Sequence, residues 1–316
     1  MSMAHLSPSS ALSTFSPWPY RFALLTTVCT LPLLFVGGLV TSLGVGLAVP
    51  DWPTTFGYNM FLYPWSQMVG GIFYEHSHRL LGSAVGFLTI LLTVALWTTE
   101  RRPWMRWLGV VALLAVIVQG VLGGLRVVLL ENLLALIHGG LAQAFFAFLA
   151  ALTLLASAEW QDRQPQKTVA DAASVQRLSV ITTVAVYAQI VLGAVVRHTG
   201  SGAEVHILGA VLVTGLVFWL VDWIVQSYAD HPSVLRSALL LRRLLFVQLG
   251  LGVLAYLGKY TASGAFLSPV VVVLATVHVV IGALMLATGV RLSLRSYRDG
   301  VAPSARPAFT PEQVSA

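Results

Sequence analysis

Eight apolar segments, each long enough to cross a lipid bilayer, dominate the sequence. They cover residues 22–47, 69–98, 105–129, 132–157, 178–198, 204–227, 239–258 and 270–294. A hydrocarbon core roughly 30 Å thick needs about 20 helical residues, and helices satisfy their own backbone hydrogen bonds in lipid. Only 9% of the 316 residues are charged, against about 25% in a soluble domain. We therefore predict an all-α integral membrane protein with eight transmembrane helices.

The basic residues between these segments predict the orientation of the chain. Fourteen of the 18 Lys and Arg residues fall on one side, and four fall on the other: Arg79, Arg126, Arg197 and Lys259. By the positive-inside rule, both termini are cytoplasmic and the connector 48–68 is an external loop. The basic residues lie in short connectors rather than on one face, so they indicate topology and no nucleic-acid partner.

A polar connector at residues 158–177 divides the chain into two halves of four helices each. We expect a cytoplasmic leader at 1–21, an N-terminal half at 22–157, a C-terminal half at 178–294 and a cytoplasmic tail at 295–316. Three apolar segments contain a Gln followed by small residues and an outer cation, starting at Gln119, Gln189 and Gln248. Close helix packing explains the glycines alone, but the recurring Gln and cation favour two similar four-helix bundles.

Four histidines occupy equivalent places near the outer ends of four predicted helices: His78, His138, His206 and His278. A small residue follows each of them by four positions, on the same helix face one turn below. A single intramembrane histidine can be a packing residue, but four in one layer indicate a function. Cys29 is the only cysteine, which excludes a cysteine-based metal cluster. Paired imidazoles suit axial ligation of haem iron.

Two haems, one in each half, are the simplest arrangement of these histidines. His78 would pair with His138, and His206 with His278. Arg126, Arg197 and Lys259 end their segments on the outer side, and Arg79 adjoins His78. These four cations are candidates to bind haem propionates by charge-assisted hydrogen bonds. The alternative is that they only extend to the membrane interface. The remaining histidines receive no ligand role: His5, His76, His198 and His231.

The stretch "FYEHSHRLLG" at 73–82 places a carboxylate beside one of the four histidines. Glu75 and His78 are three residues apart and share a helix face, whereas His76 faces elsewhere. Glu75 is therefore the candidate catalytic residue, as a proton carrier, a substrate-positioning group or a partner of the imidazole. Ala203 and Ala275 stand at the equivalent positions before the other two histidines. This asymmetry suggests that one site performs chemistry while the other carries electrons.

Together these residues resemble the haem A synthase family over residues 22–294. The resemblance rests on Glu75-x-x-His78-Arg79, on "PDWP" at 50–53, on "VRHTGSG" at 196–202 and on the three further histidines. Two features depart from the family pattern. The external loop lacks a cysteine pair, with Val49 where a cysteine often stands, and Thr41 replaces a frequent Arg.

The resemblance implies an enzyme of the bacterial inner membrane that oxidises the C8 methyl group of haem O to a formyl group, giving haem A. It implies substrate haem O in the N-terminal half and a haem b cofactor in the C-terminal half. The implied partners are haem O synthase, terminal oxidase assembly, an unidentified electron donor and membrane lipid, and a homo-oligomer is left open.

Two other functions fit the four histidines. A di-haem b-type electron-transfer cytochrome would use the same ligands, but it gives no reason for Glu75 in one half only. A haem-handling transporter or assembly factor would use the external loop as a gate. A haem prenyltransferase is disfavoured, because Asp51 stands alone where Asp-rich magnesium motifs are needed.

Overall fold

Eight long helices form the protein in the computed structural model, which describes residues 16–162, 169, 171–260 and 269–299. They are α1 Trp18–Ser42, α2 Gly71–Thr99, α3 Pro103–Val128, α4 Asn132–Ala156, α6 Ala172–Thr199, α7 Ala203–Ser227, α8 Pro232–Tyr260 and α9 Pro269–Asp299. A short helix, α5, spans Ala158–Gln161. All eight long helices are apolar and long enough to cross a membrane. The predicted fold class and number of spans are therefore confirmed.

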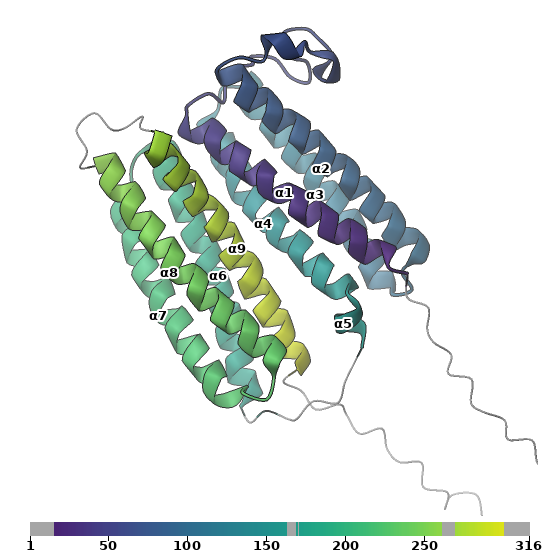
Figure 1. Cartoon of the computed structure of the whole chain (residues 1–316), viewed down its shortest axis with the longest axis vertical. Coiled ribbons are helices and arrows are strands. Elements are labelled where there is room, and N and C mark those ends of the chain that lie inside the picture. The colour runs from purple at the N-terminus through teal and green to yellow at the C-terminus, as the bar shows by residue number, and fades with distance from the viewer. Residues whose placement is uncertain (1–15, 163–168, 170, 261–268, 300–316) are drawn as a thin grey trace, which may run out of the picture.

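The long helices pack in two groups of four, which lie side by side in Figure 1. In the first group α1 contacts α2 and α4, and α3 contacts α2 and α4; in the second, α6 contacts α7 and α9, and α8 contacts α7 and α9. One apolar cluster lies around Leu92 and Leu149 in the first group; the other, around Leu220 and Leu241 in the second, also takes in Leu34 and Phe146 of the first. Contacts of α9 with α1 and α4, and of α4 with α6, join the groups. Division into two domains at the expected boundaries stays a prediction.

Several helices begin or end at residues other than those expected from hydropathy. α1 starts at Trp18, inside the expected leader, because the prolines around it suit a first helical turn. It stops at Ser42 rather than 47, because Gly44 turns the chain with a φ of +68°. α6 starts at Ala172, within the expected connector, and α9 continues to Asp299, within the expected tail. Polar residues extend these helices because backbone hydrogen bonding does not stop where hydropathy falls.

The connector between α1 and α2 forms an ordered cover over one end of the first group, visible above α2 in Figure 1. It contains two short 3-10 helices, Met60–Leu62 and Trp65–Gln67. The indole of Trp52 lies against Gly124 of α3, where any side chain would overlap the ring. Phe61 and Trp65 are largely exposed, as suits aromatic residues at a membrane interface. We call residues 49–70 the outer loop.

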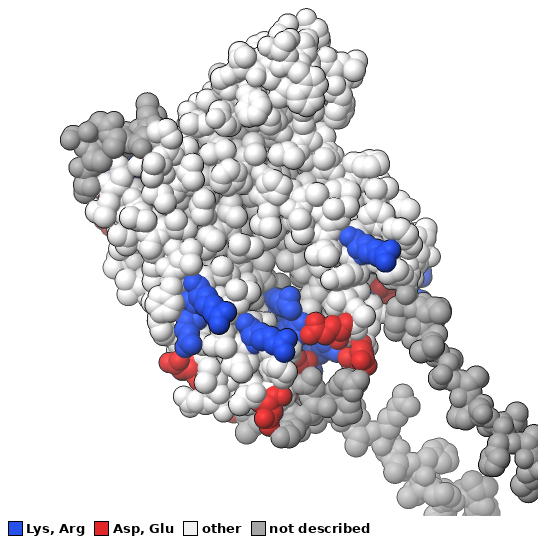
Figure 2. Space-filling model, viewed as in Figure 1, with Lys and Arg blue, Asp and Glu red and all other residues white. Residues whose placement is uncertain are grey.

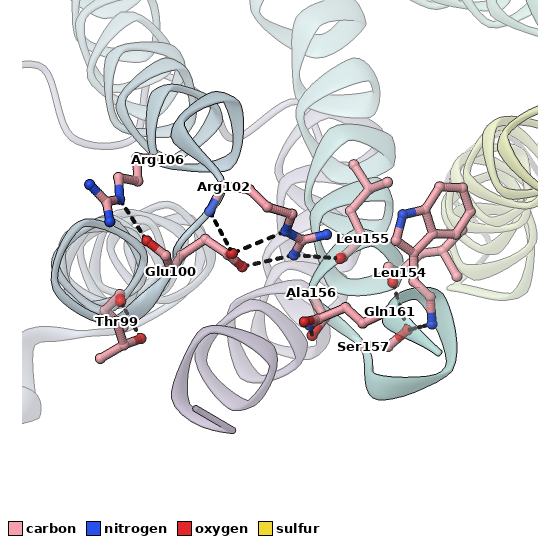
Figure 3. A network of polar contacts seen from close by, with 11 residues as sticks. Thr99, Glu100, Arg102, Arg106, Leu154, Leu155, Ala156, Ser157 and Gln161 are labelled. Atoms are coloured by element: carbon pink, nitrogen blue, oxygen red, sulfur yellow. Dashed lines mark hydrogen bonds and ion pairs between the residues drawn. The ribbon is translucent and has the colours of Figure 1, made fainter. Parts of the chain in front are cut away.

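Charged residues gather at the opposite end of the molecule. On the face shown in Figure 2, Lys and Arg side chains cluster toward the end where α1 begins and α9 ends. Figure 3 shows one network there, in which Arg102 binds the Glu100 carboxylate and the carbonyl of Leu155 in α4. Arg106 donates to the carbonyl of Glu100 at 2.6 Å. These bonds tie the α2–α3 turn to α4, while the side of the membrane on which this end lies stays a prediction.

Candidate functional site

The four histidines predicted from the sequence meet in two facing pairs. The rings of His78 in α2 and His138 in α4 lie 6.4 Å apart between centroids, with their planes at 89°. The rings of His206 in α7 and His278 in α9 lie 6.3 Å apart, with their planes at 75°. The structure therefore brings together the same pairs that the sequence suggested. Their role as iron ligands stays a prediction.

A glycine on a neighbouring helix lies beneath each of these four rings. A Cβ atom on Gly37 would fall 2.7 Å from Cε1 of His78, and Cβ atoms on the other three would fall 3.0–3.2 Å from the same atom of their histidine. Real Cβ atoms essentially never show the first distance, and the other three are tighter than nine in ten real Cβ contacts. The glycine–histidine contacts are Gly37–His78, Gly123–His138, Gly193–His206 and Gly252–His278. Each ring thus packs closely against the backbone of a glycine, and the contact is tightest at Gly37.

The two pairs fit a haem in their spacing and in their unpaired nitrogens. The Nδ1 atoms of His78, His138 and His278 are buried without a hydrogen-bond partner in the structure. A spacing of 6.3–6.4 Å between facing rings leaves room for one metal ion bound by both imidazoles, since metal–imidazole bonds are roughly 2 Å long. Below His78, the Cβ position of Gly82 has only Leu33 within reach, at 4.0 Å. A Cβ atom at Gly82 would make only this one van der Waals contact, whereas a Cβ atom at the equivalent Gly282 would meet Gln248 at 3.4 Å and Ile190 at 3.7 Å.

Glutamine side chains contact both histidines of the second pair. The Nε2 atom of Gln189 lies 3.0 Å from Nδ1 of His206 and donates to its backbone carbonyl at 2.7 Å. The Nε2 atom of Gln248 lies 3.2 Å from Nε2 of His278. Gln119, the third member of the repeated pattern, has a buried amide oxygen without a partner. The repeat thus places amides near the histidine layer.

Glu75 lies one turn from His78, but its carboxylate is fully engaged by other groups. One oxygen accepts from the backbone nitrogen of Val49 at 2.9 Å, and the other pairs with Arg79 at 2.8 Å. Arg79 also donates to the carbonyls of Val49, Asp51 and Thr54 in the outer loop. Both side chains are buried, with 5% and 9% of their surfaces exposed. The pair therefore fastens the outer loop to α2, and four of the five Arg79 N–H groups serve this purpose.

His76 is buried on a different face of α2, against the outer loop. Its Nδ1 atom lies 3.2 Å from Oγ1 of Thr55, and its ring lies 5.1 Å from that of Tyr63. It points to neither histidine pair, as its position on the helix indicated. Sequence reasoning missed this contact with the loop.

The three remaining outer cations lie in different surroundings. The Arg126 guanidinium packs against Gly46, where a Cβ atom would fall about 2.5 Å from Nη2. Arg197 donates from Nη2 to the carbonyl of Gly38 at 2.5 Å and to Oγ of Ser42 at 2.6 Å, both in α1. Lys259 lies in the last turn of α8. Arg197 thus reaches into the other half, and the propionate roles of all four cations stay predictions.

The four glycines are the residues of the site that sequence reasoning did not single out. Gly123, Gly193 and Gly252 each follow a glutamine of the repeated pattern by four residues, so the signal was present in the repeat. The fourth, Gly37, follows Leu33 and carries no such marker. Without the structure, a glycine beneath a ligand cannot be told from one that serves helix packing.

Comparisons with known proteins agree on one family. Residues 20–205 match the family model COX15-CtaA, described as cytochrome oxidase assembly protein. This span includes His78 and His138 and ends one residue before His206. The chain is 32% identical over 232 residues to the heme A synthase of Shouchella clausii, covering 72% of this chain and 73% of that protein.

Two further relatives are named in the same way. The heme A synthase of Alkalihalophilus pseudofirmus is 31% identical over 203 residues, which cover 62% of this chain and 65% of that protein. That of Bacillus licheniformis is 30% identical over 183 residues, or 56% of this chain and 58% of that protein. With eight apolar helices and bacterial relatives, the chain fits a multi-pass protein of a bacterial inner membrane. The chain belongs to the haem A synthase family of cytochrome oxidase assembly proteins.

Proposed function

We propose that this protein is an oxidoreductase that converts haem O to haem A by oxidising the C8 methyl group to a formyl group. The observation that carries the proposal is the presence of two facing histidine pairs in one chain, only one of which has a buried carboxylate one turn away. Its relatives are named heme A synthases. A cytochrome that only transfers electrons has no use for this difference between the halves.

In this proposal the N-terminal half holds the substrate. His78 and His138 bind the iron of haem O, and Gly37 and Gly123 keep the two rings facing each other. The outer loop covers the outer end of this half, through its bonds with Arg79 and Glu75. The cover limits the access of water to a reactive centre, which is a common requirement of oxidation chemistry.

The C-terminal half holds a haem b cofactor between His206 and His278. Haem b supplies one-electron transfer when it is bound. The glycines beneath both rings and the amide of Gln189 fix the orientation of the histidines before the group binds. The electron donor that feeds this half is not identified by the chain.

Glu75 is the group proposed to accept or relay protons during the oxidation. A carboxylate can do this while an amide of the same shape cannot. Its hydrogen bond from Val49 and its pairing with Arg79 also link it to the outer loop. The product haem A would then pass to terminal oxidase assembly, and haem O synthase would supply the substrate.

Pigment analysis tests the proposal directly. The chain is expressed with a source of haem O in cells that lack their own haem A synthase, and the extracted haems are separated by chromatography. We expect a formyl haem with the wild-type chain and none with the His78→Ala variant. If haem O is recovered unchanged while both low-spin signals are present, the protein is an electron-transfer cytochrome instead.

A further inference from the structure

One arginine of the second half is bonded to the helix that supports a histidine of the first half. Arg197 lies near the end of α6, four residues after Gly193, which lies beneath His206. Its Nη2 atom donates to the carbonyl of Gly38 and to the hydroxyl of Ser42. These acceptors belong to the last turns of α1, 159 and 155 positions away in sequence.

The acceptor Gly38 adjoins the glycine beneath His78. Gly37 faces α2 and supports the His78 ring, whereas Gly38 faces α9, where a Cβ atom would fall 2.8 Å from Cγ2 of Thr276. The end of α1 therefore packs directly against α2 and α9 through the backbone of Gly37 and Gly38. A shift of α1 at this level changes the distance from Gly37 to the His78 ring.

A third group completes the connection. The Ser42 hydroxyl, which accepts from Arg197, lies 3.1 Å from the hydroxyl of Thr276 in α9. Thr276 is two residues before His278, and it is completely buried. Arg197, Ser42 and Thr276 thus link α6, α1 and α9 at the level of the histidine layer. We call these three residues the cross-half tie.

We propose that Arg197 is a positioning residue for the histidine pair of the opposite half: through the cross-half tie it holds Gly37 against His78. This inference rests on the proposed binding of haem by the two pairs. It differs from the expectation that Arg197 binds a propionate within its own half. A residue of the second half then sets the haem affinity of the first.

The test uses the purified full-length protein reconstituted with haem b, and it measures spectra and affinity rather than conversion. The variants His138→Ala and His278→Ala first assign the two low-spin electron paramagnetic resonance signals to their pairs. Arg197→Gln should weaken haem binding at the His78–His138 pair about tenfold, the effect of losing a hydrogen bond to a charged group. The signal of the His206–His278 pair should stay unchanged.

Ser42→Ala removes the other side of the same tie and should alter the same signal in the same direction. The double variant should weaken haem binding by less than the sum of the two single effects, because both changes remove the Arg197–Ser42 hydrogen bond. Arg243→Gln, an exposed cation outside both sites, is the matched control and should alter neither signal. If Arg197→Gln fails to accumulate, Ser42→Ala alone decides the matter.

Two results would overturn the inference. Arg197→Gln could alter only the His206–His278 signal, which would make Arg197 a propionate ligand of its own half. The second such result is that neither Arg197→Gln nor Ser42→Ala would alter the His78–His138 signal. A different failure, in which the two histidine variants remove no low-spin signal, would contradict the proposed ligands and hence the proposed function.

Discussion

The two halves of the protein have nearly the same pair of histidines but very different outer ends. In the first half, an outer loop of about twenty residues is fastened to α2 by a buried ion pair between Glu75 and Arg79. In the second half, α6 and α7 are joined by residues 200–202 alone, where Gly200 and Gly202 adopt φ angles of +73° and +82°. The two halves thus share nearly the same histidine spacing, while among the described residues the long loop and the buried acid that it contacts belong to the first half.

This difference indicates where specialisation lies. The ring spacing differs by only 0.1 Å between the pairs, so the histidine spacing does not distinguish the first pair from the second. The groups that differ are the outer loop with the residues that hold it, and the glutamine amides that contact the second pair. Experiments that change these groups one at a time test whether they account for the difference between the two halves.

Removing a histidine should have the largest effect. His78→Ala or His138→Ala should abolish haem A formation and leave one low-spin signal, whereas His206→Ala or His278→Ala should remove the other signal. Each loss follows from removing one of two axial ligands. Electron paramagnetic resonance of the purified variants measures it. An unchanged pair of signals in all four variants would show that other residues bind the iron.

Variants of the Glu75–Arg79 ion pair should separate the role of Glu75 in holding the outer loop from its proposed role in proton transfer. Leaving one buried charge without its partner costs about 3–5 kcal/mol, so Arg79→Gln should release the outer loop. Glu75→Gln should stop or stall conversion while leaving the haem b of the second half intact. Limited proteolysis within residues 49–70 and pigment analysis measure the two effects. A Glu75→Gln enzyme that converts haem O at the wild-type rate would remove Glu75 from the chemistry.

Replacing a glycine that lies beneath one of the four histidines should weaken haem binding more than replacing a glycine elsewhere in the first group of helices. Gly37→Ala places a methyl group 2.7 Å from the His78 ring, and such overpacking costs about 1–3 kcal/mol. Haem binding at the first pair should weaken accordingly. Gly120→Ala is the matched control, because its Cβ atom would meet nothing within 4 Å. Equal haem affinities for the two variants, measured by titration, would contradict a supporting role for Gly37.

His76→Ala should loosen the outer loop without altering either low-spin signal. The change removes the partner of Thr55 and the contact with Tyr63, and a lost hydrogen bond of this kind costs about 1–3 kcal/mol. Proteolysis of the loop should be faster, and most of the conversion activity should remain. An inactive His76→Ala enzyme that has lost the signal of the first pair would instead make His76 a ligand.

The smallest expected effect is a loss of outer-loop stability at low pH. Burial raises the pKa of Asp51, but hydrogen bonds from Gly57, Thr54 and Phe56 outweigh it and leave the pKa below its ordinary 3.8. Because the folded loop binds the proton less tightly than the unfolded loop does, Asp51 stabilises the loop above pH 3.8, and this contribution is lost as the pH falls through the lower folded value. Tryptophan fluorescence of the loop between pH 5 and pH 3 should report the loss. Asp51→Asn should remove this pH dependence, and an identical profile in the variant would assign the transition to another group.

Much of the site was predictable from the sequence because its pattern is local. His78 and Glu75 are three residues apart on one helix, so their shared face follows from helix geometry alone. The pairing of His78 with His138 follows from the order of four helices joined by short connectors. The partner of Arg79 was not predictable, because the loop carbonyls it binds have no side-chain signature.

The sequence by itself determined the eight spanning helices and the single layer of histidines, since hydropathy and helical spacing act over a few turns of one segment. Three features depend on the tertiary structure: which glycine lies beneath each ring, the hydrogen bond from the outer loop to Glu75, and the hydrogen bonds from Arg197 to the opposite half. These contacts join residues as many as 159 positions apart. They depend on how whole helices approach one another. In the sequence, a glycine or a backbone carbonyl at such a contact looks the same as one that serves helix packing only.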